Sequence, residues 1–380
     1  MTEETEEFSA NSEDYVQEEP TKEEISNAAA AVDPLLAELE LAIGHGDFAE
    51  YAINVSKKIV RQEDALIRQI QDTGLSAGTT DPLNLGIMAP TSEGKTYPVI
   101  EVMKLFPKEQ VWKVGHMSPM ALVRQKGILV DENNEPVGDI VKKLRREIFL
   151  LGNGKKDKVR MVALKEELSD VLENSKRLID LSGRILLFLE PPHPDLWDKI
   201  KPILSHDTYE IEFPYVDKTD RGGIATQNVV IRGWPACIFC SAKDESKWPQ
   251  WPEIVSRFLI TSPNMVARKY QESNLLIAQR KGLPALLQEQ MIISNEEIRL
   301  AKLCIQFLSR QIERLSKDNK NPVWIPYTNI LGEALPAEKG TDNRITKRIF
   351  SLLNIVPLTK AHLRDELHYG PETQIIATLE

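Results

Sequence analysis

The sequence predicts an α/β fold in which helices flank a parallel sheet, and three observations predict it. Apolar strand-like runs alternate with helical patterns between Pro82 and Ser262. The segment APTSEGKT, residues 89–96, lies between one such run and a helical pattern. A further apolar run, ILLFLE, ends in a single carboxylate, Glu190. Together these features predict a sheet that carries a phosphate-binding loop at the end of one strand.

The chain begins with an acidic segment. Residues 1–33 hold eleven acids and one base, which accounts for the whole formal net charge of −10. This composition predicts a disordered tail. The remaining chain is neutral, so the global charge neither favours nor excludes nucleic acid as a partner.

Helical spacing follows the tail. Phe48, Val55 and Leu66 belong to a series of apolar residues three, four or seven positions apart, which predicts a helical N-terminal module over residues 34–78. The α/β core is expected over residues 79–265. Its candidate strands are Leu83–Met88, Val111–Val114, Arg184–Leu189, Ala236–Ser241 and Phe258–Thr261.

The last third of the chain predicts a helical segment over residues 266–320 and a small, mainly helical unit over residues 321–380. Short helices and candidate strands in that unit resemble a winged-helix arrangement. Cys237 and Cys240 stand in an apolar run, CIFC, and are interpreted as small core residues of a buried strand. No apolar run approaches the roughly 18 residues of a membrane span, and no signal peptide is recognised. We therefore expect a cytoplasmic protein without membrane partners.

The loop APTSEGKT matches the Walker A pattern. Such a loop needs glycine where backbone N–H groups surround the phosphates, a lysine for the β- and γ-phosphates, and a hydroxyl for Mg²⁺. Gly94, Lys95 and Thr96 supply this end of the motif, and Ala89 stands where glycine usually opens the loop. We expect ATP and Mg²⁺ as cofactors. The whole loop is the candidate nucleotide site: Ala89, Pro90, Thr91, Ser92, Glu93, Gly94, Lys95 and Thr96.

A P-loop ATPase also needs a strand that ends in a carboxylate, which holds the water shell of magnesium or orients the attacking water. Glu190 is the best candidate, although a merely solvated glutamate is the competing interpretation. Leu189 precedes it, so the usual Asp-Glu pair is missing. Either Glu190 serves both roles or another acid, such as Asp195, shares them.

Two strand-like arms then flank a turn that contains Asp220, Arg221, Gly222 and Gly223, which predicts a β-hairpin. Lys218 and Arg221 at its tip are candidate nucleic-acid contacts, and ordinary solvated charges are the alternative. A basic, helical stretch from Val141 to Arg160 would add contacts of the same kind.

Two further side chains are candidates for nucleotide chemistry. Ser241 ends the strand PACIFCSA and would lie beside the γ-phosphate if the acidic strand is its neighbour. Arg257, in EIVSRF, could act on the ATP of a neighbouring subunit. The alternatives are a capping or solvated serine and a surface arginine in a salt bridge.

In this order, the loop APTSEGKT, the strand ILLFLE, the inserted hairpin, the strand ending CSA and the SRF segment resemble the core of AAA+ ATPases. The similarity is greatest to helicase-like ATPases of phages, plasmids and other mobile elements, which are often partnered with primases and are similar to superfamily 3 helicases. LNLGI, PILSHD and IRGWPACIFCSA extend the match over roughly residues 65–262.

The resemblance implies a role for each candidate residue. Lys95 and Thr96 would bind phosphate and Mg²⁺, and Glu190 would handle magnesium or water. Ser241 would sense the γ-phosphate and Arg257 would be an arginine finger. Lys218 and Arg221 would contact nucleic acid.

The expected function is an ATP-hydrolysing motor that forms a homo-oligomeric ring, such as a hexamer, and translocates on or unwinds DNA, with single-stranded DNA as the expected partner. No primase or zinc motif occurs in the chain, so a primase or other replication protein would be a separate partner. The alternative is a nucleotide-dependent remodelling or regulatory ATPase that acts on a protein partner without helicase activity.

Overall fold

The computed structural model describes residues 33–114, 127–152, 158–217, 225–242, 249, 251–317, 319, 321–369 and 372–378. The chain divides into two compact units, Met1–His45 and Gly46–Glu380. In the first unit, helix α2 (Pro34–Ile43) begins after Asp33, whose carboxylate accepts a 2.9 Å hydrogen bond from the Leu35 N–H. All elements below belong to the second unit.

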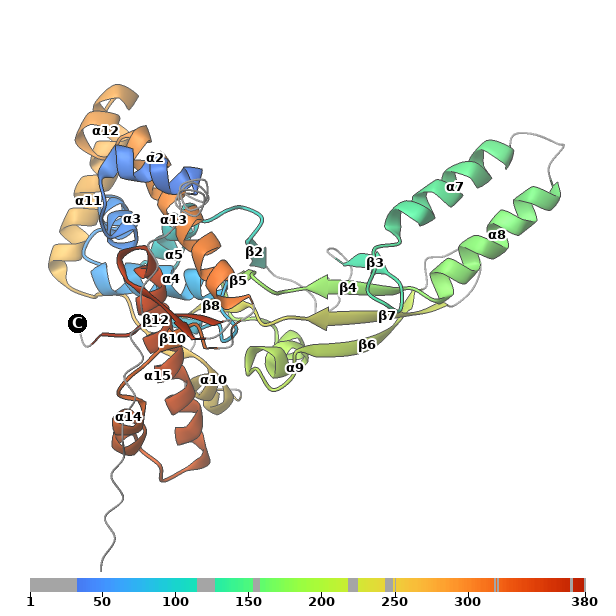
Figure 1. The fold of residues 1–380 in the computed structure, drawn as a ribbon. Coiled ribbons are helices and arrows are strands. Elements are labelled where there is room, and N and C mark those ends of the chain that lie inside the picture. The colour runs from blue at the N-terminus through green and yellow to red at the C-terminus, as the bar shows by residue number, and fades with distance from the viewer. Residues whose placement is uncertain are drawn as a thin grey trace, which may run out of the picture. The chain divides into compact units, whose positions relative to one another are not determined.

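A five-stranded parallel sheet forms the centre of this unit (Figure 1), which confirms the predicted α/β fold class. Its spatial order is β2-β5-β8-β1-β9. The five strands match the predicted ones to within a residue at each end. They are β1 (Asn84–Met88), β2 (Val111–Val114), β5 (Ile185–Phe188), β8 (Ala236–Ser241) and β9 (Leu259–Thr261).

The sheet is buried because its strands are apolar on both faces. Every residue of β1, β5 and β8 is buried, as expected for a parallel sheet covered on both sides. Phe239 packs edge-on against Phe258, with ring centroids 5.1 Å apart. Gly86 lies so close to the Phe239 ring that an added Cβ would come within 2.6 Å of its Cζ. Cys237 and Cys240 are buried in β8, as predicted.

Helices on either side of the sheet contribute the remaining buried side chains of the core. Helix α4 packs against β1, β8 and α5, while α13 packs against α3 and α4. Ser294 and Glu297 form a capping box at the start of α13, with hydrogen bonds of 3.1 and 3.0 Å. The bounds of these helices are α3 (Phe48–Lys57), α4 (Asp64–Ser76), α5 (Thr96–Met103), α9 (Pro194–Leu204), α10 (Trp251–Arg257), α11 (Ala267–Gly282), α12 (Ala285–Met291) and α13 (Asn295–Ser316).

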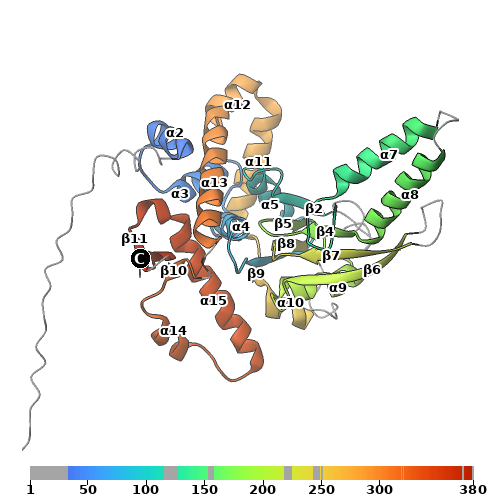
Figure 2. The same cartoon turned by 45° about the vertical axis from the view of Figure 1, so that its right-hand side comes forward.

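A second sheet is inserted between β2 and β8 in the chain. Its order is β3-β4-β7-β6, built from β3 (Ile128–Val130), β4 (Lys176–Asp180), β6 (Glu210–Asp217) and β7 (Ala225–Arg232). Strands β6 and β7 are the arms of the predicted hairpin and pair antiparallel as far as Asp217 and Ala225. The predicted basic helical stretch forms two helices, α7 (Gly138–Gly152) and α8 (Lys158–Glu173), which lie side by side in Figures 1 and 2.

The C-terminal segment contains three short strands, a short helix and one helix of 20 residues, which is longer than the short helices expected there. A three-stranded sheet has the order β10-β12-β11, with β10 (Val323–Trp324), β11 (Glu366–Tyr369) and β12 (Glu372–Ile376). Between β10 and β11 lie α14 (Thr328–Ala334), α15 (Gly340–Thr359) and the 3₁₀ turn η2 (Ala361–Leu363). Helix α15 packs against α10, α4 and α13. The winged-helix assignment stays a prediction, as do the domain boundaries.

Among the described residues, no helix is both long and apolar enough to cross a membrane.

Candidate functional site

The predicted phosphate loop connects the carboxyl end of β1 to the first turn of α5, the strand–loop–helix context that the motif requires. Ser92 and Gly94 adopt left-handed backbone conformations, with φ of 72° and 77°. Glycine is favoured at such a position because it has no Cβ. The Ala89 N–H donates a 3.1 Å hydrogen bond to the Ser241 carbonyl, which fixes the start of the loop to β8.

Two residues of the loop, Ala89 and Lys95, have surroundings that fit their residue types. Ala89 is buried and has a negative φ, so the position does not need glycine. The Lys95 ammonium donates to the Pro90 carbonyl at 3.2 Å and therefore lies over the loop. Below the loop, burial raises the pKa of the Cys240 thiol to about 11, against the lowering effects of a Thr96 hydrogen bond and the Lys95 charge.

The order of the strands brings three predicted features to one edge of the sheet. β8 lies between β1 and β5, and Ser241 is the register partner of Met88. Glu190 follows the end of β5 by two residues and is exposed. Because all these strands are parallel, the loop, Ser241 and Glu190 stand at the same carboxyl edge. Ser241 was expected beside the γ-phosphate only if the acid-ended strand is the neighbour of its own strand, and this condition is met.

Thr96 and Glu190 were predicted to hold Mg²⁺. Their hydroxyl and carboxylate oxygens are ligands that Mg²⁺ prefers, and the ion commonly keeps several waters and substrate phosphates in its shell. In the described part of the chain, no group of three or more His, Cys, Asp or Glu side chains is arranged to hold a metal by itself. Thr96 and Glu190 could supply one or two protein ligands to an ion that also binds substrate phosphates.

A buried ion pair supports the loop from outside, and sequence reasoning missed it. Lys269 of α11 and Glu63, which precedes α4, have side chains only 8% and 2% exposed, and Lys269 Nζ lies 2.5 Å from Glu63 Oε1. The same ammonium donates to the Glu93 carbonyl of the loop at 3.1 Å. The two residues are far apart in the sequence and neither belongs to a motif, so no local signal could have paired them.

Beside the loop is a cavity of about 330 Å³. The Arg280 guanidinium donates to the Tyr97 hydroxyl at 2.9 Å, and the Tyr270 hydroxyl hydrogen-bonds the Glu93 carboxylate. Apolar side chains, including Leu276, line the cavity together with further polar ones, such as Arg61 and Ser273. The volume and the mixed lining are those of a small-molecule site.

Arg257 lies at the opposite edge of the central sheet. It ends α10, directly before β9, and it lines a cavity together with Leu83 and Asn84 at the start of β1. Its guanidinium donates to the Glu253 carbonyl at 3.0 Å, and its side chain is 10% exposed. Arg257 is thus held in a pocket, about one strand length, or about 16 Å, from the phosphate loop of its own chain.

The predicted nucleic-acid contacts cannot be located in the same way. Lys218 and Arg221 lie outside the described residues, although the strands that lead to them do not. In the basic stretch, the described cations are exposed on the helix pair: Lys142, Lys143, Arg145, Arg146, Lys158 and Arg160.

The chain matches no protein-family model, and a search of curated proteins finds no match to it.

Proposed function

We propose that this chain is an ATP-hydrolysing motor of the AAA+ type that works on DNA. One observation carries the proposal: a single strand, β8, separates the phosphate-loop strand β1 from the acid-ended strand β5. Three different chemistries, a cationic loop, a buried hydroxyl and a carboxylate, are thereby available along one edge. If the same eight residues formed an ordinary turn, the fold would not need a hydroxyl and a carboxylate beside it on the same edge of the sheet.

Each residue then has a definite task. Lys95 exchanges its Pro90 carbonyl for the β- and γ-phosphates, while loop N–H groups bind the remaining oxygens. Glu190 orients the attacking water, and Ser241 distinguishes the nucleotide with a γ-phosphate from the one without it. Thr96 and Glu190 would hold Mg²⁺, which neutralises developing charge on the phosphates.

The cavity beside the loop suits the base and ribose. Lys269 and Tyr270 hold Glu93 on one side, and Tyr97 and Arg280 close the other side. Since α11 supplies three of these residues, a nucleotide in the cavity would contact the loop and α11 together. Binding and release would therefore act on the position of α11.

DNA is the proposed substrate of the motor because the sequence predicts the basic residues Lys218 and Arg221 at the tip of the β6–β7 hairpin, whose strands pair as far as Asp217 and Ala225. A ring of identical chains, such as a hexamer, would direct these tips at a single strand in its channel. Phosphate contacts of this kind are insensitive to sequence. A primase would act as a separate partner.

A second candidate is favoured by a different observation. At the far end of the α7–α8 pair, Phe149, Leu150 and Val159 are between 63% and 86% exposed. Apolar side chains in such a position suit contact with another protein. A remodelling ATPase that acts on a protein partner is therefore the alternative.

The experiment that tests the proposal is ATP turnover of the full chain with and without single-stranded DNA, at two fixed salt concentrations. We expect stimulation by DNA that is lost in Lys218→Ala/Arg221→Ala while basal turnover is kept. The matched control is Lys302→Ala/Arg310→Ala, which removes two exposed cations from α13 and should retain stimulation. Turnover that never responds to DNA would reject the DNA motor and favour the second candidate.

A further inference from the structure

A cavity of about 380 Å³, which we call the arginine pocket, lies at the amino edge of the central sheet. Helices α10 and α15, the turn after α9 and the residues before β1 form its walls. Four cationic side chains line it against two carboxylates. The cations are Arg257, Arg344, Lys347 and Arg348, and the carboxylates are Asp81 and Asp207.

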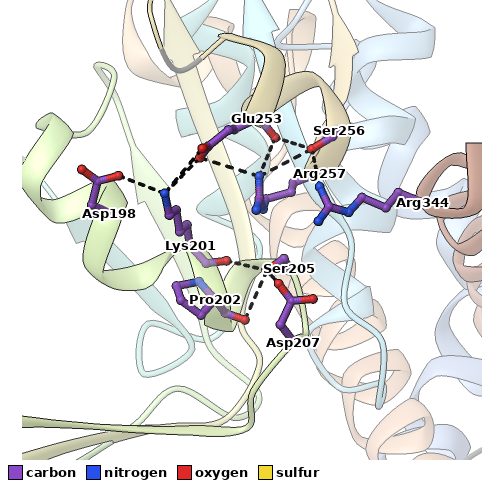
Figure 3. Close-up of polar contacts among 9 residues, drawn as sticks. All are labelled: Asp198, Lys201, Pro202, Ser205, Asp207, Glu253, Ser256, Arg257 and Arg344. Atoms are coloured by element: carbon purple, nitrogen blue, oxygen red, sulfur yellow. Dashed lines mark hydrogen bonds and ion pairs between the residues drawn. The ribbon is translucent and has the colours of Figure 1, made fainter. Parts of the chain in front are cut away.

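The guanidinium groups are held mainly by neutral acceptors. Arg344 Nη1 donates to the Ser256 hydroxyl at 3.0 Å, as Figure 3 shows, and Arg348 Nη1 donates to the Val255 carbonyl at 2.9 Å. Arg257 donates to the Glu253 carbonyl and pairs with the Glu253 carboxylate at 3.8 Å, and Lys201 shares that carboxylate at 3.3 Å. The four cations that line the pocket outnumber its two carboxylates, and Arg344 and Arg348 are positioned by neutral acceptors, so the lining keeps an excess of positive charge.

The two lining carboxylates already have partners. Asp81 accepts from Ser351 and contacts His206 at 2.5 Å, while Asp207 accepts a 2.5 Å hydrogen bond from the Ser205 hydroxyl (Figure 3 shows the last contact). Hydrogen bonds from His206 and Ser351 outweigh burial and lower the pKa of Asp81. Neither acid forms an ion pair with an arginine of the pocket among the described residues.

Holding the arginines in these positions lowers the free energy of unfolding. The Nε atoms of Arg257 and Arg348 are buried without a hydrogen-bond partner in the described part of the chain. Burial, and then the nearby charge of Arg344, lower the pKa of Arg257. Unpartnered buried donors and like charges at short range both destabilise a fold unless a ligand uses them.

We propose that the arginine pocket binds a phosphate group, with Arg257, Arg344 and Lys347 as its ligands. Three cations on two different helices suit a doubly charged oxyanion, because each can donate a charge-assisted hydrogen bond to a different oxygen. Arg348 positions α15 against α10 and keeps these ligands together.

The phosphate group bound by the arginine pocket can come from either of two sources, and both present the same chemistry to the pocket. It is either free in solution, as inorganic phosphate or pyrophosphate, or it belongs to a nucleotide on the phosphate loop of a second copy of the chain. The loop of the same chain is excluded as a source because it stands at the other edge of the sheet. The second source rests on the proposed function, whereas binding by the pocket does not.

The first experiment measures pyrophosphate binding by calorimetry at constant ionic strength. The full chain carries Lys95→Ala, so that the phosphate loop does not contribute. Arg344→Gln and Lys347→Gln remove exposed side chains and should leave the fold intact. We expect each to weaken binding about tenfold, whereas Arg310→Gln, an exposed arginine on α13, leaves it unchanged. No pyrophosphate binding by the Lys95→Ala chain, or equal binding in all variants, would overturn the proposal.

The second experiment identifies the source. Assembly of the chain with an intact loop is followed by sedimentation with a non-hydrolysable ATP analogue. If Arg344→Gln/Lys347→Gln weakens assembly while each chain still binds the ATP analogue, the phosphate comes from the nucleotide of a second copy. If the pair leaves assembly unchanged but still abolishes pyrophosphate binding, the ligand is the free anion.

Discussion

At the scale of single residues, the buried Glu63–Lys269 pair holds a side chain that donates directly to the phosphate loop. Lys269 is nearly inaccessible, so its charge must be compensated inside the protein, and Glu63 is its acidic partner. The Lys269 ammonium also donates to the Glu93 carbonyl of the loop and lies 5.8 Å from the centroid of the Tyr270 ring. A carbonyl alone does not offset the desolvation of an ammonium ion.

We therefore predict that Glu63→Gln destabilises the chain by about 3 kcal/mol, since it leaves a buried cation without its partner. It should also weaken ATP binding, because Lys269 no longer holds Glu93 in place. Urea unfolding and nucleotide titration measure the two effects. Asp139→Asn, which breaks an exposed pair with Lys142, should change neither. A stable Glu63→Gln chain with normal ATP affinity would contradict the assignment.

Asp72 gives a pH-dependent prediction. Burial, opposed by Arg68 and reinforced by Asp47 and Glu50, raises its pKa from 3.8 to about 7. The folded chain thus keeps a proton that the unfolded chain loses above about pH 4, so the free energy of unfolding falls as the pH rises to about 7. Above that pH the loss is complete.

Asp72→Asn removes this titration. We expect it to be more stable than the parent chain at pH 8, by on the order of 2 kcal/mol, and to lose most of that advantage at pH 5. Chemical denaturation at the two pH values measures the difference. An advantage that is the same at both would show that Asp72 ionises normally.

At the scale of elements, the five strands of the central sheet are predictable because each is a short apolar run with polar flanks. The phosphate loop is predictable for a related reason, since its chemistry is contained in eight consecutive residues. Strands β3 and β4 escape prediction because β3 pairs with β4 and β4 pairs with β7, and each partner follows by more than forty residues. Lys269 and Arg344 escape it likewise, because only the tertiary fold brings them to their sites.

The close packing of β1 against β8 makes a prediction at this scale. At Gly86 an added Cβ would lie 2.6 Å from Phe239 Cζ and 2.9 Å from Ile260 Cδ1. Gly86→Val should therefore destabilise the chain by about 2–3 kcal/mol through overpacking. It should also reduce ATP turnover, because β1 carries the loop. Denaturation midpoints check the first effect.

Gly138→Ala is the control, because an added Cβ there meets no atom within 4 Å and the residue lies at the start of α7. It should leave both stability and turnover nearly unchanged. If Gly86→Val matched this control, the contact between β1 and β8 would be looser than the structure indicates.

At the scale of the whole molecule, the two edges of the central sheet carry different groups that could act on one bound nucleotide. The carboxyl edge carries the phosphate loop, and the amino edge carries Arg257 in the arginine pocket. A head-to-tail contact between identical chains joins two different surfaces and can close into a ring. Such a contact would let the amino edge of one chain meet the nucleotide of the next, which one chain alone cannot do.

Mixing two inactive variants tests this arrangement. Arg257→Ala should bind ATP but not hydrolyse it, and Lys95→Ala should lose phosphate binding. In a random equal mixture, about one interface in four joins an intact loop to an intact Arg257, so turnover should recover to about a quarter of the parent value. The measurement is ATP hydrolysis across a range of mixing ratios, with co-assembly verified by sedimentation of differently labelled chains. Co-assembled mixtures that stay inactive would place the action of Arg257 within its own chain, against the separation of the two edges.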